Sequence, residues 1–107
     1  MSFAGTLSSS KSSLPLSSKT QRVDCFSVMA EADPSVLPRI LDIVAMFDRV
    51  PERCHAVRLD HEPGRPLMID LQIAGLAERD VHLIEKKLER MLFVTQILCS
   101  EKRQAAA

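Results

Sequence analysis

The stretch that decides the fold is FSVMAEADPSVLPRIL, Phe26–Leu41, in which an apolar run gives way to a helical pattern. Up to Ala30 the residues are compatible with a β-strand. Asp33 then offers an N-cap carboxylate, and Pro34 has the fixed φ angle that suits the first position of a helix. The stretch therefore predicts a strand over Val23–Ala30 and a helix directly after it.

The helix after Pro34 is indicated by apolar residues that recur at helical spacing. Pro38 falls inside the first turns and cannot donate a helix hydrogen bond, so we expect a tight or irregular first turn. Pro51 closes the helix. The apolar positions are Val36, Leu37, Ile40, Val44 and Phe47, with Leu41 and Ile43 beside them.

The chain beyond Pro51 predicts three more strands and a second helix. The run PLMIDLQIA has the clearest strand alternation, with leucines and isoleucines on one face and Asp70 and Gln72 on the other. The second helix is amphipathic, with acids near its start and basic residues near its end, as the helix dipole favours. The predicted elements are a strand at Arg53–Asp60, a Pro-Gly turn at His61–Arg65, a strand at Pro66–Ala74, a helix at Ala77–Met91 and a strand at Phe93–Ser100.

The order of these elements predicts an α+β protein. Two strand–helix–strand halves can interleave into a ferredoxin-like βαββαβ sandwich, a four-stranded antiparallel sheet with two helices on one face. The uncovered face then needs water or a partner. We predict a disordered Ser-rich tail over residues 1–21, one folded domain over 22–101 and a frayed C-terminal tail over 102–107.

Charge and cysteine content restrict partners and location. Residues 1–22 carry three basic residues and no acid, hence +3, and the remainder has 11 basic and 14 acidic residues, hence −3. That balance gives no reason to bind nucleic acid, and no apolar run approaches the roughly 20 residues that span a bilayer. The three dispersed cysteines lie in apolar, strand-like runs and indicate buried, reduced thiols in the cytoplasm. The Ser-rich start also fits an organelle transit peptide, but without an amphipathic stripe we favour a plain tail.

No pattern indicates catalysis, a metal or another cofactor. His55, His61 and His82 are the general-base candidates, and none stands in a recognisable motif with a nucleophile and a carboxylate. Cys54 and His55 are adjacent, but neighbours in a strand point to opposite faces and cannot easily share an ion. We therefore expect a protein that is not an enzyme, with no catalytic residues, no metal site and no cofactor.

The loop between the first strand and the first helix is the remaining candidate site. A helix start presents unpaired N–H groups that suit a carboxylate. The simpler alternative is that Asp33 itself caps these donors and nothing else binds. Local chemistry favours the cap.

A family resemblance changes this balance. An acidic residue, an Asp-containing turn, a small residue, Val-Leu and then Arg-Ile follow the first strand, and this pattern resembles the ACT domain, a small regulatory module of amino-acid metabolism. The resemblance covers Val23 to about Ser100, so residues 22–101 are read as an ACT-like domain. Within the family the sequence looks most like the small regulatory subunits of acetolactate synthase. The residues that carry the pattern are Glu31, Ala32, Asp33, Pro34, Ser35, Val36, Leu37, Arg39 and Ile40.

The resemblance implies a homodimer through sheet edges that binds a small amino-acid effector and controls the catalytic subunit of an amino-acid biosynthetic enzyme, with acetolactate synthase and branched-chain synthesis as the first candidate. The implied ligand-binding residues are Glu31, Ala32, Asp33, Pro34, Ser35, Val36 and Leu37, closed by Pro51 and Glu52 from a second subunit. Ser35 stands where ligand-binding members usually carry Gly. The alternative is therefore a structural assembly module of the same fold that docks on a protein partner without an effector.

Overall fold

The computed structural model describes residues 20–105, which form one four-stranded sheet and two helices. In chain order the elements are β2 (Thr20–Ala30), α1 (Val36–Met46), β3 (Arg53–Arg58), β4 (Leu67–Ala74), α2 (Glu78–Glu89) and β5 (Val94–Ala105). The strands lie in the order β3-β4-β2-β5, and each neighbouring pair is antiparallel. The predicted βαββαβ ferredoxin-like sandwich is confirmed.

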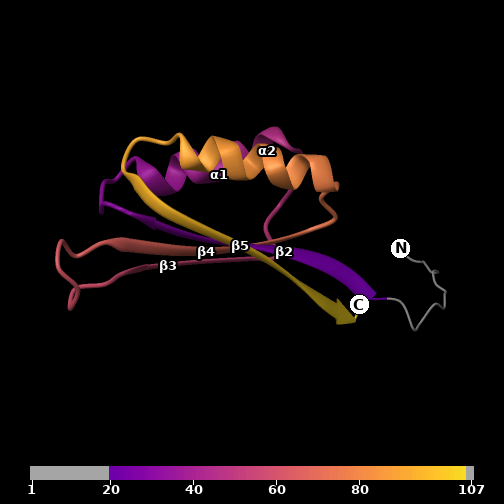
Figure 1. Ribbon diagram of the computed structural model, residues 1–107, viewed down its shortest axis with the longest axis horizontal. Coiled ribbons are helices and arrows are strands. Elements are labelled where there is room, and N and C mark those ends of the chain that lie inside the picture. Colours follow the sequence, from indigo (N-terminus) through magenta and orange to yellow (C-terminus); the bar gives the residue numbers. More distant parts are fainter. Residues whose placement is uncertain (1–19, 106–107) are drawn as a thin grey trace, which may run out of the picture.

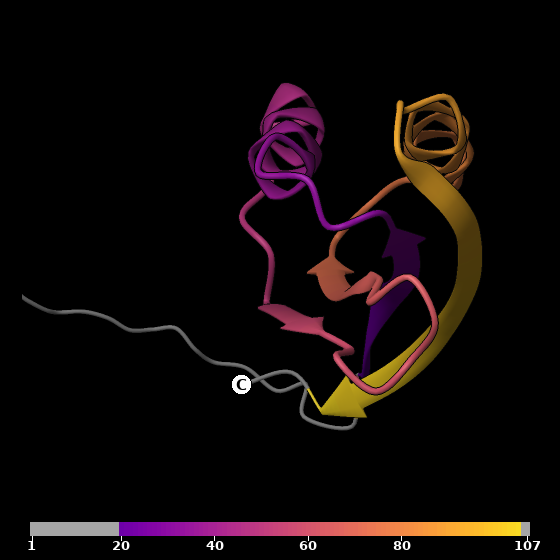
Figure 2. The same ribbon diagram turned by 90° about the vertical axis from the view of Figure 1, so that its left-hand side faces the viewer.

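Both helices cover the same face of the sheet, as Figures 1 and 2 show. In Figure 2, α1 lies on the side of the edge strand β3 and α2 on the side of the other edge strand, β5. The buried side chains between the sheet and the helices come mainly from the two central strands and the two helices. They include Phe26 and Val28 of β2, Ile69, Leu71 and Ile73 of β4, Ile40 and Val44 of α1, and Ile84 and Leu88 of α2.

The alternation of β4 determines which residues point away from the helices. Ile69 and Leu71 are buried under the helices, whereas Asp70 and Gln72 are half-buried on the opposite side, as predicted. The pairings carry this alternation across the sheet, since Asp70 lies opposite Ser27 of β2 and His55 of β3. We call the sheet surface opposite the helices the open face.

The start of α1 differs from the prediction. The helix begins at Val36 with Ser35 as its N-cap residue, so Asp33 is not the N-cap and Pro34 is not the first helical residue. Asp33 instead closes the preceding turn: one of its carboxylate oxygens, Oδ2, accepts hydrogen bonds from the backbone N–H (2.9 Å) and the hydroxyl of Ser35. Pro38 is the third residue of the helix, where a missing N–H costs little because first-turn donors lack intrahelical partners.

The two ends of the folded region also extend further than predicted. Thr20 and Gln21, assigned to the N-terminal tail, are the first residues of β2, and they pair with Ala105 and Gln104. The predicted frayed segment from residue 102 is strand as far as Ala105. An ion pair of Arg22 with Glu101 on the neighbouring strand, at 3.3 Å, accompanies this pairing. The rest of the predicted tails, residues 1–19 and 106–107, lies outside the described residues.

Candidate functional site

Three segments meet at one end of the sheet and enclose a groove of about 520 Å³. They are the loop after β2, the hairpin between β3 and β4 with the last residue of β3, and the turn just before β5, all of which lie at the left in Figure 1. We call this the loop groove. Its lining residues are Glu31, Ala32, Asp33, Arg58, Gly64, Arg65 and Phe93.

The loop wall of this groove is held by short hydrogen bonds. The Glu31 N–H donates to the carbonyl of Phe93 at 2.8 Å, and the Asp33 N–H donates to the carbonyl of Glu31, also at 2.8 Å. The hydroxyl and the backbone N–H of Ser35, with a smaller contribution from the charge of Arg39, lower the pKa of Asp33. Asp33 is therefore a carboxylate at neutral pH, and one of its oxygens is already engaged within the turn.

The hairpin wall of the groove carries two arginines that share one acid. The Nε atoms of Arg58 and Arg65 lie 3.1 Å and 3.4 Å from the same oxygen, Oδ1 of Asp60. The hairpin is closed by the Leu59 N–H, which donates to the carbonyl of Pro66 at 2.8 Å. Both guanidinium groups therefore approach one point at the edge of the groove.

Three residues of the lining have a left-handed backbone. The φ angles are 79° for Gly64, 48° for Arg65 and 79° for Phe93. For a bulky residue such as Phe93 this conformation is unusual and strained. In this conformation the carbonyl of Phe93 accepts a hydrogen bond from the Glu31 N–H, and the side chain packs against the core.

The structure brings together only some of the predicted ligand-binding residues. Glu31, Ala32 and Asp33 line the loop groove. Val36 is fully buried, and Leu37 packs against the core. The exposed Pro34 and the half-buried Ser35 belong to the turn before the helix and are not among the groove residues.

Pro51 and Glu52 lie at the other end of the sheet within the same chain. The Glu52 N–H donates to the carbonyl of Gln72 at 2.7 Å, whereas the loop follows Ala30, which pairs with Leu67. Five residue steps along β4 separate Leu67 from Gln72, about 16 Å. Pro51 and Glu52 can therefore meet the loop only from a second chain, which is how the sequence resemblance placed them.

The arginines and Phe93 were missed as site residues in the sequence. The segment HEPGR indicated only a turn between strands. The signal that could have identified them is topological: β4 is antiparallel to both β2 and β3. The hairpin that joins β3 to β4 must then lie at the same end of the sheet as the end of β2.

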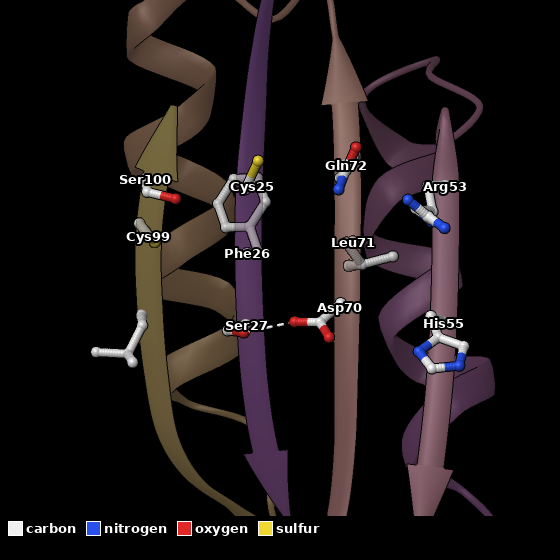
Figure 3. A pocket seen from close by; sticks show the side chains of 11 residues that line it. Cys25, Phe26, Ser27, Arg53, His55, Asp70, Leu71, Gln72, Cys99 and Ser100 are labelled. Atoms are coloured by element: carbon white, nitrogen blue, oxygen red, sulfur yellow. Dashed lines mark hydrogen bonds between the residues drawn. The ribbon is translucent and has the colours of Figure 1, made fainter. Parts of the chain in front are cut away.

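A second groove, of about 490 Å³, lies on the open face. Figure 3 shows it with the helices behind the sheet: Arg53 stands beside Gln72, and His55 stands beside Asp70 in the next row. The Ser27 hydroxyl donates a hydrogen bond to Asp70 Oδ1. The hydroxyl hydrogen of Ser27 is therefore engaged in this bond, and Asp70 is directed toward β2 rather than toward a histidine. We call this the open-face groove.

The histidines are distributed over separate parts of the molecule. His55 lies in the open-face groove, His61 in the β3–β4 hairpin and His82 on the exposed side of α2. Cys25, Cys54 and Cys99 are free thiols, but Cys25 is half-buried and Cys54 and Cys99 are exposed, so the prediction of buried thiols is wrong. Within residues 20–105, no group of three or more His, Cys, Asp or Glu side chains could hold a metal ion. No helix in this part of the chain is long and apolar enough to cross a membrane.

Comparison with protein families gives a match over most of the chain. Residues 17–106 match the family model described as an ACT-like domain. Among curated proteins, none matches this sequence. ACT domains are generally regulatory, amino-acid-binding domains.

Solved structures share the fold at low sequence identity. The ACT domain of the GTP pyrophosphokinase of Chlorobium tepidum aligns with a TM-score of 0.61 and 12% identity, over 76% of this chain and 100% of that one. The C-terminal domain of the MgtC protein of Mycobacterium tuberculosis aligns with a TM-score of 0.62 and 11% identity, over 82% of this chain and 94% of that one. A homoserine dehydrogenase of Thiobacillus denitrificans aligns with a TM-score of 0.59 and 19% identity, over 84% of this chain but 19% of the enzyme.

Proposed function

Since the chain belongs to the ACT-like domain family, we propose that it is a non-catalytic regulatory domain or subunit that binds a small amino acid and controls an amino-acid biosynthetic enzyme. In this proposal the amino acid occupies the loop groove. Occupancy shifts the packing of the subunits, and the enzyme responds to that shift.

The observation that carries the proposal is the position of the loop groove. The predicted loop residues Glu31, Ala32 and Asp33 form one wall of a groove of about 520 Å³, within the size range of small-molecule sites. Carboxylates and guanidinium groups line the same groove. A surface with charges of both signs suits a zwitterion.

The proposal also names the regulated enzyme, the oligomeric state and the cellular location of the protein. Acetolactate synthase is supported by the resemblance of the segment from Glu31 to Ile40 to its small regulatory subunits, and branched-chain synthesis follows from that enzyme. A homodimer through the β3 edge is supported by the exposure of every residue of that strand. In such a dimer Pro51 and Glu52 of the partner subunit would close the site. The three free thiols support a location in the reducing cytoplasm.

Thermal unfolding of the full chain with each of the twenty amino acids tests the binding proposal. A ligand that binds only the folded state stabilises it by about 2.7 kcal/mol at 100 times its Kd. We expect one or a few small apolar amino acids to raise the midpoint, and their D-enantiomers to have no effect. If no amino acid raises the midpoint at millimolar concentration, the binding proposal is wrong.

The second candidate is an assembly module that docks on a protein partner without an effector. The open face supports it, because Leu98 is 62% exposed there and Val57 is 38% exposed. This candidate predicts an oligomer or complex whose formation does not depend on amino acids. The regulatory proposal predicts that the activity of an acetolactate synthase catalytic subunit, mixed with the purified chain, changes when the amino acid is added.

A further inference from the structure

We infer that the arginine pair Arg58 and Arg65 binds the carboxylate of the ligand and that Glu31 binds its ammonium group, so that the loop groove selects free α-amino acids with a small apolar side chain. This inference rests on the proposed function, because it gives an orientation to the amino acid proposed there. It differs from the sequence-based expectation, in which backbone amides at the helix start hold the carboxylate.

The arginine pair is preorganised for an anion. Asp60 Oδ1 attracts both guanidinium groups through their Nε atoms, at 3.1 Å and 3.4 Å. Their terminal Nη groups form no hydrogen bond or ion pair with any other described residue. Two neighbouring guanidinium groups with free terminal N–H donors match the two oxygens of a carboxylate.

The helix start is a weaker carboxylate site in this chain. The N–H of Ser35 is already bound by Asp33 at 2.9 Å, and the N–H of Val36 donates to the carbonyl of Asp33 at 3.1 Å. The ionised Asp33 stands beside these donors and repels a second carboxylate. At the hairpin, two guanidinium groups share the single carboxylate of Asp60, so one positive charge is left over to attract a second carboxylate.

The opposite wall offers an acceptor for an ammonium group. The backbone of Glu31 is fixed by its bonds to Phe93 and Asp33. Its carboxylate forms no hydrogen bond or ion pair within residues 20–105, in contrast to the carboxylate of Asp33, which holds Ser35. Glu31 is therefore the freer of the two acids for a ligand.

The apolar part of the lining limits the ligand side chain. Only Ala32 and Phe93 contribute apolar side chains to the loop groove. Arg65 and Phe93 have a left-handed backbone, which is unfavourable for residues other than glycine, and strain of this kind is concentrated at ligand sites. A small apolar side chain fits this surface. A ligand with a single charge leaves one of the two walls without its partner.

Calorimetric titration of the full chain tests this assignment. The probes are L-alanine, L-valine and L-leucine, each beside its carboxamide, which lacks the carboxylate, and its deaminated acid, which lacks the ammonium group. The variants are Arg58→Gln, Arg65→Asn and Glu31→Gln. Asn is chosen for position 65 because it tolerates a left-handed backbone. Arg79→Gln is the matched control, because Arg79 has a side chain that is 83% exposed on α2 and lies outside both grooves.

We expect a free amino acid to bind at least tenfold more tightly than its carboxamide and its deaminated acid. Arg58→Gln and Arg65→Asn should each weaken binding of the amino acid by about tenfold, so that it binds no more tightly than its carboxamide. Glu31→Gln should remove its advantage over the deaminated acid, and Arg79→Gln should change nothing.

The outcomes separate this inference from the proposed function. If an amino acid binds and both arginine variants, folded by circular dichroism, bind it as tightly as the unsubstituted chain, the assignment is overturned while amino-acid binding stands. Equal binding of the amino acid and its carboxamide by the unsubstituted chain has the same meaning. If none of the probes and none of the twenty amino acids binds, both proposals are overturned.

Discussion

The thiol of Cys99 provides a quantitative test of the β5 register. Cys99 lies opposite Phe26, so its side chain is on the helix side of the sheet, near α2. Partial burial, followed by the charge and hydrogen bonding of Glu85 and by the charges of Glu89 and Asp24, raises the pKa of the Cys99 thiol from 9.0 to about 11. A register shift by one residue would place this side chain on the open face, away from those carboxylates.

The shift predicts slow reaction of Cys99 with a disulfide reagent. Two pKa units leave about 100-fold less thiolate at pH 8, and the higher nucleophilicity of the more basic thiolate recovers about tenfold, with a Brønsted slope of about 0.4–0.5. The net expectation is a reaction about tenfold slower than in the unfolded chain.

The assay uses a variant with Cys25→Ser and Cys54→Ser, so that Cys99 is the only thiol. The rate is followed from about pH 7 to pH 11, with the same variant in urea as the reference. Glu85→Gln removes one of the charges and should lower the pKa of Cys99. A pH–rate midpoint for the folded chain equal to that of the unfolded chain would refute the placement of Cys99 beside α2.

Three further predictions concern stability. Ile69→Ala removes a fully buried side chain of a central strand and should lower the free energy of unfolding in urea by about 2–5 kcal/mol. Val57→Ala, at a position that is 38% exposed, should lower it clearly less. Equal losses would contradict the assignment of the core face. Gly75→Ala should destabilise the protein by about 1–2 kcal/mol, because φ is +78° there and this left-handed conformation is unfavourable for a residue with a Cβ atom; an unchanged thermal midpoint would count against that turn. The lowered pKa of Asp33 means that the ionised side chain stabilises the folded state above the pKa that Asp33 has in the unfolded chain, and that this stabilisation is lost as pH falls through the lower pKa of the folded state. Asp33→Asn should therefore reduce the free energy of unfolding at pH 7 and leave it nearly unchanged at about pH 2. A loss that is the same at both pH values would be inconsistent with the Ser35 contacts.

The sequence was sufficient for the fold where apolar alternation is strong. The leucines and isoleucines of β4 identify its buried face directly, because a strand with one covered face must alternate. The segment from Glu101 to Ala105 has no such pattern, and it is strand because it pairs with β2. Pairing of this kind depends on the partner strand and leaves no local signal. The helix start was predicted two residues too early, at Asp33 instead of Ser35, because an Asp before a helix can cap it or close the turn in front of it with equal local chemistry.

The candidate site was predictable in part for a related reason. Glu31, Ala32 and Asp33 follow one another in the chain, so a local pattern could identify them. Arg58 and Arg65 belong to a segment more than twenty residues away, and they reach the loop only through the order and direction of the strands. Their side chains could not be assigned to the site until that order was known.

Binding of an amino acid in the loop groove can be observed residue by residue, by recording amide chemical shifts of the ¹⁵N-labelled chain during titration with the amino acid that stabilises it most. We expect the largest shifts at Glu31, Ala32, Gly64 and Arg65, which line the loop groove, while the amides of Ser27, Asp70 and Gln72 in the open-face groove stay unchanged. Shifts confined to the open-face groove, or no shifts at saturating amino acid, would contradict this expectation.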